Sequence, residues 1–157
     1  MHVETHRDRM TTDLFFTLQL LDCFPDLRLT ADVSHYLVAR EFASPVADTN
    51  HALIHRILDN AWGIHGRIAS REQIQVSLGF PQHKDLVSLL MGWWEYGIRS
   101  WKRRVAPDAS LTFLSELGLP PYAITGPDGK ELSDRWQDAL LMKDMIRALW
   151  DRVAKEP

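Results

Sequence analysis

The sequence predicts an α/β fold built on parallel βα units. Short segments rich in strand-forming residues alternate four times with longer segments of helical periodicity. A side chain of metal-ligand type stands near the end of each candidate strand, namely Glu4, Asp32, His65 and Glu116. Their spacings are 28, 33 and 51 residues, and a βα unit needs roughly 30 residues. The pattern therefore predicts one such side chain on each strand of a parallel sheet.

The first βα unit occupies residues 1–25. Residues 1–6 form a short predicted strand that carries Glu4. Thr11-Thr12-Asp13 is a helix N-cap signal, and Pro25 ends the helix that follows it. The apolar residues at helical spacing between these signals are Leu14, Phe15, Leu18 and Leu21.

The second and third units are less regular. A strand is predicted over 27–32 and ends at Asp32. A short helix over 35–41, a loop over 43–48 and a helix over 50–60 follow it. The third strand is predicted over 63–68, and a long loop over 69–83 contains the breakers Gly79 and Pro81. Loops of this length in compact domains are usually functional.

The fourth unit contains the helix with the broadest apolar face, predicted over 84–104. A strand over 111–116 ends at Glu116, a loop over 118–129 follows, and Ser133-Asp134 caps the last helix. Trp136 and Trp150 are predicted to pack against neighbouring helices. The residues predicted to share the apolar face of this last helix are Ala139, Met142, Ile146, Leu149 and Val153.

Composition excludes several classes of protein. The net charge of −3 gives no basic surface for nucleic acid, and Lys102-Arg103-Arg104 is expected to complement a helix C-terminus. No apolar run reaches the ~18 residues of a membrane span, so we expect a soluble, cytoplasmic protein. Cys23, the single cysteine, is expected to be a buried small hydrophobe. His51 and His55 are expected to form a solvent-facing pair.

Four βα units amount to half of an eight-stranded TIM (β/α)8 barrel, which needs about 250 residues. We therefore expect residues 1–157 to form a single domain of four strands with outer helices. Such a domain is either a fragment of a longer protein or a chain that pairs with another to cover its open edges.

The chain resembles the C-terminal half of a sugar-phosphate isomerase/epimerase of the xylose isomerase-like TIM barrel superfamily, over its whole length. The Asp-x-x-His element at Asp32–His35 is the most distinctive part. The segments that carry the resemblance are Val3-Glu4-Thr5-His6-Arg7, Leu29-Thr30-Ala31-Asp32-Val33-Ser34-His35, Ile64-His65-Gly66-Arg67 and Leu114-Ser115-Glu116 with Pro120-Pro121-Tyr122. The family's N-terminal half has no counterpart in this chain.

The resemblance implies a set of site residues. The expected ligands of one divalent metal ion are Glu4, Asp32, His65 and Glu116. The resemblance also implies that Glu4 and Glu116 act as the acid/base pair. His35 and Arg71 would contact the substrate; Arg71 is placed only by spacing, and Arg67 is the alternative. From the residues alone, Asp32 could instead cap the following helix.

These residue types suit removal of a proton alpha to a carbonyl. A cation would polarise the carbonyl and stabilise an enediolate, while two carboxylates remove and return the proton. Ligation by oxygen atoms with one imidazole favours Mn²⁺, Mg²⁺ or Co²⁺, with Zn²⁺ as a further possibility. The resemblance thus implies a metal-binding isomerase or epimerase of carbohydrate metabolism, with manganese as one expected metal. A dehydratase acting on an inositol-like ketone would begin with the same step.

Two other functions stay open at this point. The first is a non-catalytic half barrel that needs a partner chain. The second is a metal hydrolase resembling endonuclease IV, which would need more metal ligands and a basic surface for DNA. The expected partners are a small sugar or polyol substrate and either a second copy or the missing N-terminal half. No nucleic acid or membrane partner is expected.

Overall fold

The computed structural model describes residues 2–155 and confirms an α/β architecture. A four-stranded sheet has the order β1-β2-β3-β4, with every neighbouring pair parallel. The strand order therefore follows the chain order, as in one continuous arc of βα units. The strands are β1 (Val3–Glu4), β2 (Leu29–Ala31), β3 (Ala61–Gly66) and β4 (Thr112–Ser115).

The described residues also form five α-helices and one 3-10 turn, and the last helix, α5, follows the final strand. Asp13 caps α1 by accepting a hydrogen bond from the backbone N–H of Phe16, as the sequence predicted. Asp134 caps α5 in the same way, through the N–H groups of Trp136 and Gln137. The helices are α1 (Leu14–Cys23), α2 (Ser34–Ala39), α3 (Asp48–Leu58), η1 (Pro81–His83), α4 (Lys84–Lys102) and α5 (Arg135–Ala154).

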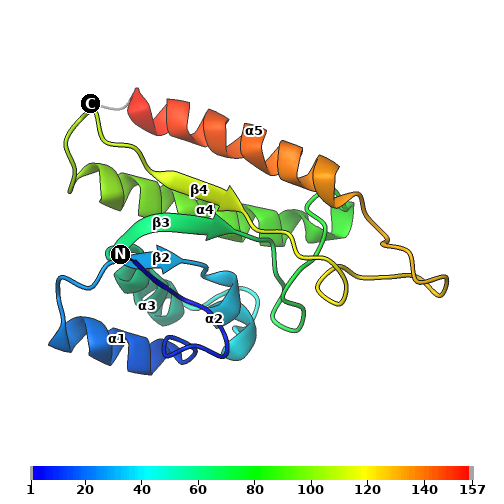
Figure 1. Cartoon of the computed structure of the whole chain (residues 1–157), viewed down its shortest axis with the longest axis horizontal. Helices are drawn as coiled ribbons and strands as arrows, with labels where there is room; N and C mark the ends of the chain where they lie inside the picture. Colours follow the sequence, from blue (N-terminus) through cyan, green and yellow to red (C-terminus); the bar gives the residue numbers. More distant parts are fainter. Residues whose placement is uncertain (1, 156–157) are drawn as a thin grey trace.

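The long helices form one layer in chain order, because α1 packs on α3, α3 on α4 and α4 on α5. Figure 1 shows α1 and α5 at opposite ends of this array, with the strands between them. Leu29, Ala31 and Ile64 project from the strands into the buried core with the helices. The opposite face of the sheet carries no helix of its own among residues 2–155.

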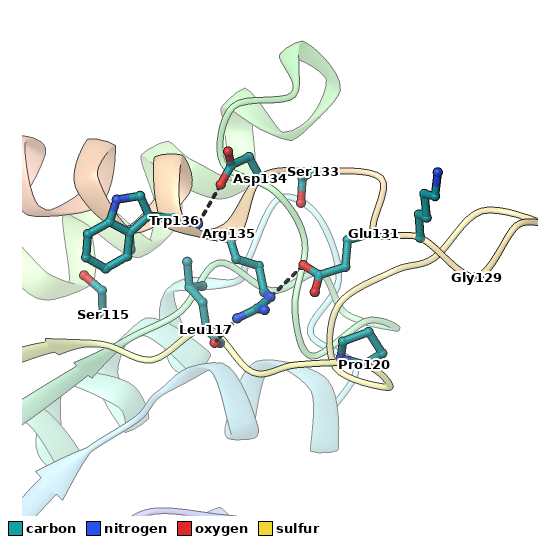
Figure 2. A pocket seen from close by; sticks show the side chains of 11 residues that line it. Ser115, Leu117, Pro120, Gly129, Glu131, Ser133, Asp134, Arg135 and Trp136 are labelled. Carbon is teal, nitrogen blue, oxygen red and sulfur yellow. Dashed lines mark hydrogen bonds and ion pairs between the residues drawn. The ribbon is translucent and has the colours of Figure 1, made fainter.

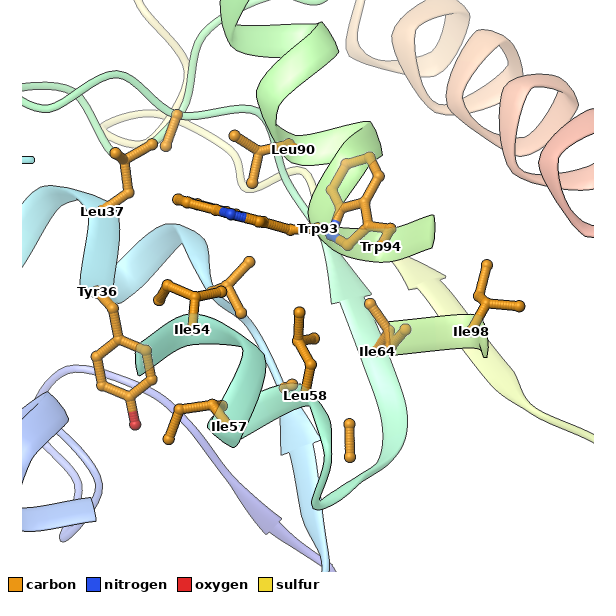
Figure 3. Close-up of a cluster of buried hydrophobic side chains, with 14 of the residues drawn as sticks. Tyr36, Leu37, Ile54, Ile57, Leu58, Ile64, Leu90, Trp93, Trp94 and Ile98 are labelled. Carbon is orange, nitrogen blue, oxygen red and sulfur yellow. The ribbon is translucent and has the colours of Figure 1, made fainter. Parts of the chain in front are cut away.

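The core is densest where α3 and α4 meet β3. Trp93 and Trp94 are adjacent in sequence, yet each is only 1% exposed. Trp93 points toward α2 and α3, and its Nε1 donates to His51 Nδ1 over 2.8 Å (Figure 3). Trp94 packs edge-on against Phe113 of β4. The two indoles therefore pack in different parts of one core. Neither is exposed enough to contact another chain.

Strand β3 contains an irregularity that matters for the site. Leu29 pairs with Ala61 but the next residue of β2, Thr30, pairs with Gly63, so Trp62 is an extra residue. The guanidinium of Arg28 lies 3.9 Å from the ring centroid of Trp62. The strand predicted over 63–68 begins and ends two residues earlier, at Ala61–Gly66.

Several sequence predictions were wrong about exposure. Cys23, expected to be buried, is exposed at the end of α1. Trp136 is 69% exposed and does not pack between helices. The rings of His51 and His55 do lie 6.3 Å apart, but both residues are half-buried, because His51 accepts a hydrogen bond from Trp93 and His55 stacks on Tyr96 at 3.7 Å. Met1 of the predicted first strand lies outside the described residues.

The large exposed apolar side chains gather at the two ends of the strand order. Those around β1 and α1 are Met10, Phe15, Phe16 and Phe24. Those on and after β4 are Leu114, Leu119, Ile124, Leu132, Trp136 and Leu141. Both end strands are also unpaired on their outer sides within the described residues, and unpaired edges promote association. No described helix is both long enough and apolar enough to cross a lipid bilayer.

We expect this chain to self-associate through these two edges. Because the strands are parallel, β1 of a second copy can continue the sheet beyond β4 in the same direction. Sedimentation velocity should show a dimer, and Trp136→Gln should shift the distribution toward monomer by removing exposed apolar surface from the β4 edge. A stable, compact monomer at every concentration would contradict this expectation.

Candidate metal centre

Three of the predicted metal ligands meet at one end of the open face of the sheet. Glu4 is the last residue of β1, His65 lies near the end of β3, and Glu116 directly follows β4. One ligand atom from each lies within 4.8 Å of the others. His65 Nδ1 is 3.0 Å from Glu4 Oε1 and 2.8 Å from Glu116 Oε2. The convergence predicted from the βα spacing is therefore present for these three residues.

Strand register explains why His65 and Glu116 meet. His65 pairs with Leu114, and the N–H of Glu116 donates to the carbonyl of Gly66. Side chains two residues apart on a strand share a face, so Glu116 follows Leu114 onto the face that carries His65. Gly66 lies on the other face, where an added Cβ would come within 2.4 Å of the Phe113 ring.

Glu4 is positioned by hydrogen bonds from its neighbours. The hydroxyl of Thr11 donates to the carbonyl of Glu4. Thr5, which is fully buried, joins β1 to β2: its hydroxyl lies 3.1 Å from the Asp32 carbonyl and accepts from the Asp32 N–H over 2.8 Å. These contacts hold a two-residue strand whose own pairing is minimal.

The electrostatics of the three residues follow from their contacts. The hydrogen bond with Glu116 raises the pKa of His65, against an opposing effect of burial. The same bond, with Arg67 nearby, lowers the pKa of Glu116 to about 2. A proton on His65 Nδ1 thus sits between two carboxylates, where a divalent cation would replace it on binding.

Asp32 lies behind this group and is fully buried. Its Oδ1 accepts from the N–H of Ser34 at 3.0 Å and from the Ser34 hydroxyl, at the start of α2. Its Oδ2 is 3.5 Å from both His35 Nε2 and Arg67 Nε. Burial raises the pKa of Asp32 to about 6, although Arg67 opposes the shift. Asp32 is not part of the three-residue group, so its role as a fourth ligand stays a prediction.

The arginine found in the cluster is Arg67. It is 1% exposed, and its Nη2 lies 2.5 Å from Glu116 Oε1. Arg71, the residue expected from spacing, lies 2.7 Å from Glu72 and 3.9 Å from Glu41. Its side chain lines a separate cavity of about 550 Å³ between α2, α3 and α4. Substrate contact by Arg71 stays a prediction. Arg67 is the arginine that lies among the predicted ligands, in contact with Asp32 and Glu116.

Unpartnered buried polar atoms gather in the same place. Residues 2–155 contain seven buried side-chain nitrogen or oxygen atoms without a hydrogen-bond partner, and five belong to Asp32, His35 and Arg67. Both ring nitrogens of His35 are among them. Such atoms are costly to bury and mark places where a ligand or ion supplies partners. The unpartnered atoms are therefore concentrated in residues next to the three candidate ligands, since Arg67 also contacts Glu116.

Sequence reasoning gave no role to two residues around the cluster, His6 and Arg7. The His6 ring lies 4.1 Å from that of His35. The guanidinium groups of Arg7 and Arg67 each lie 5.0 Å from the centroid of the Tyr122 ring. His6, Arg7 and Tyr122 all lie inside the sequence segments that carry the family resemblance. That resemblance is the signal from which a role near the cluster could have been predicted for them.

A roomier cavity lies beyond β4, away from the three ligands. It has a volume of about 830 Å³, and Ser115, Leu117 and Trp136 are among its lining residues (Figure 2). None of Glu4, His65 and Glu116 lines it. The cavity lies at the open edge of the sheet, and we assign it no chemistry.

Comparison of the chain with protein-family models, with curated proteins and with solved structures gave no match. The assignment of function therefore rests on the residues and their geometry.

The raised pKa of Asp32 predicts a specific pH dependence of stability. Its stabilising contribution is complete below the unfolded pKa of 3.8 and is lost as pH rises through the folded value of about 6. Relative to Asp32→Asn, the wild-type free energy of unfolding should therefore fall by roughly 2–3 kcal/mol between about pH 4 and pH 7.5. Urea unfolding of both proteins with a chelator present measures this difference, and a constant difference would contradict the predicted shift.

Proposed function

We propose that this chain supplies the metal-binding centre of a divalent-metal-dependent isomerase or epimerase that acts on a small sugar or polyol. The observation that carries the proposal is the approach of the Glu4, His65 and Glu116 ligand atoms to within 4.8 Å of one another. Two carboxylates and one imidazole at the C-terminal ends of parallel strands fit a catalytic metal site.

The residues present fit such a metal in donor type and in environment. Glu4 and Glu116 offer oxygen atoms and His65 offers Nδ1. Their side chains are 35%, 28% and 21% exposed respectively, which leaves the group open to substrate on one side. Oxygen-rich ligation favours Mn²⁺, Mg²⁺ or Co²⁺, and three protein ligands with one open position also suit catalytic Zn²⁺.

The chemistry assigned to the protein residues is proton transfer. A bound divalent cation would polarise the carbonyl of a ketose and so acidify its alpha C–H group. Glu4 and Glu116 lie on either side of His65 Nδ1, so one carboxylate can remove the alpha proton while the other returns one. The hydrogen bond with His65, and then the contact with Arg67 over 2.5 Å, lower the pKa of Glu116 and keep it ionised.

A non-catalytic half barrel that works only with a partner remains the second candidate. The apolar side chains exposed at both ends of the strand order favour it. The endonuclease-type hydrolase has less support, because the described residues contain a single candidate group of three ligands and the chain has a net charge of −3. Exchange of a substrate proton in the presence of bound metal separates the first proposal from the half-barrel alternative.

Removal of one ligand should weaken metal binding. Calorimetric titration with Mn²⁺ should show a loss of at least roughly tenfold in affinity for Glu116→Gln. Glu131→Gln is the matched control, because Glu131 also contacts an arginine, Arg135, and its side chain is 22% exposed. Equal affinities for wild type, Glu116→Gln and Glu131→Gln would remove the metal hypothesis.

Catalysis should appear as exchange of a substrate proton. Incubation of a panel of ketoses and cyclic polyol ketones with the chain and Mn²⁺ in deuterated water should incorporate deuterium at the alpha carbon. Glu4→Gln should abolish the exchange by removing one member of the carboxylate pair. If no substrate exchanges while Mn²⁺ still binds, the half-barrel alternative is favoured.

A further inference from the structure

A smaller cavity lies at the N-terminal ends of the parallel strands, opposite the metal centre. Its volume is about 310 Å³, which falls at the lower end of the range of small-ligand pockets. The chain segments that lead into β2 and β3 line it, together with the residues that follow α4. The side chains that matter for its chemistry are those of Asp26, Arg28, Asp59, Trp62 and Arg104.

Two arginines of this cavity lie against the same indole, that of Trp62. The guanidinium carbon of Arg28 is 3.9 Å from the centroid of the Trp62 ring, and that of Arg104 is 5.6 Å from it. The negative face of an aromatic ring attracts and orients such cations. Trp62 is the extra residue of β3, so the irregularity of this strand brings two positive charges to one cavity.

Backbone carbonyl groups fix the position of Arg104. Its Nε donates to the Ser100 carbonyl over 3.2 Å, and its Nη2 donates to the Ala61 carbonyl over 2.8 Å. A guanidinium has five N–H groups, so several of those on Arg104 stay available. Within residues 2–155 none of them forms an ion pair with a carboxylate.

Arg28 is still less engaged by the rest of the protein. Its side chain is exposed on one side and stacks on Trp62. Among residues 2–155 it forms no hydrogen bond and no ion pair through its guanidinium. All its N–H groups are therefore free to donate to a ligand, while the ring holds the group beside the cavity.

The two carboxylates of the cavity do not neutralise the arginines by direct contact. Asp59 is occupied by hydroxyl groups: its Oδ1 accepts from Ser100 over 2.6 Å and from Tyr96 over 3.1 Å, and its Oδ2 lies 3.2 Å from the Tyr96 hydroxyl. At longer range its charge compensates part of that of Arg104. Asp26 is exposed and forms no ion pair among residues 2–155. The positive charge open to a ligand is therefore chiefly that of Arg28.

These donors favour a ligand with several acceptor oxygens and more than one negative charge. Guanidinium groups recognise phosphate and carboxylate through paired N–H donors. A phosphate group carries close to two negative charges at neutral pH and has three acceptor oxygens. It can therefore accept from both arginines at once and still outweigh the repulsion from Asp26, which a carboxylate with a single charge does less well.

We propose that this cavity is a second ligand site, which binds phosphate or a small phosphate monoester through Arg28 and Arg104. The site lies at the opposite end of the strands from Glu4, His65 and Glu116. A ligand there takes no part in the proposed proton transfer. The proposal therefore stands apart from the proposed function and does not require a bound metal.

Calorimetric titration of the whole chain with inorganic phosphate, at constant ionic strength and with a chelator present, tests this site. Arg28→Gln should weaken phosphate binding by roughly tenfold, because it removes charge-assisted hydrogen bonds. The fold loses no hydrogen bond in this variant, since the guanidinium makes none among residues 2–155. Arg40→Gln is the matched control, because Arg40 is also exposed and lies 4.7 Å from an aromatic ring, that of Phe15, outside this cavity.

A second variant should change the affinity in the opposite direction. Asp26→Asn removes a like charge from the cavity and should strengthen phosphate binding by roughly two- to fivefold at low ionic strength. Acetate, titrated in the same way, should bind more weakly than phosphate because it carries one charge and two oxygens.

The outcomes separate the site from its alternatives. Weaker binding in Arg28→Gln with unchanged binding in Arg40→Gln supports the site, and stronger binding in Asp26→Asn places the ligand inside the cavity. Absence of phosphate binding to the wild type, equal effects of Arg28→Gln and Arg40→Gln, or no gain in Asp26→Asn overturns the proposal. Acetate binding as tight as phosphate binding overturns the choice of ligand. All these titrations omit Mn²⁺, so a negative result leaves the proposed function standing.

Discussion

The candidate site depends on one buried positive charge, the guanidinium of Arg67. It lies between Asp32 and Glu116, is 1% exposed, and contacts both carboxylates. A fully buried carboxylate such as Asp32 is unstable in its ionised form unless a cation compensates it. Removal of Arg67 would leave Asp32 buried without its nearest positive charge and would free Glu116 to move. Arg67 therefore links the interior of the sheet to the ligands at its open end.

Much of the fold followed from local signals. Asp13 and Asp134 marked the helix starts correctly, and four strands alternating with helices gave the parallel sheet. The meeting of Glu4, His65 and Glu116 was also predictable, because parallel strands bring their C-terminal ends to one edge. An actual barrel is not part of this structure, which contains a four-stranded arc.

The positions of side chains beyond the strand ends could not be predicted from the sequence. Arg71 was placed by counting from His65, but the chain turns after β3, where Ser70 N–H donates to the Gln73 carbonyl, and Arg71 follows that turn to Glu72. Arg67 could have been chosen from strand alternation, since it stands two residues after His65 and shares its face. The exposure of Cys23 depends on which helix face meets α3, and a lone cysteine carries no signal for that.

The extra residue in β3 determines which face of the sheet His65 occupies. Ala61 faces the helix layer. If every residue from Ala61 onward alternated strictly, Trp62 included, residue 65 would face the helix layer too. Trp62 shifts this phase by one, so that Ile64 enters the core while His65 reaches the carboxylates. Excision of that single tryptophan would remove the bulge and leave Ile64 inside with His65 outside, whereas regular pairing of Trp62 with Thr30 would turn the imidazole inward among aliphatic groups.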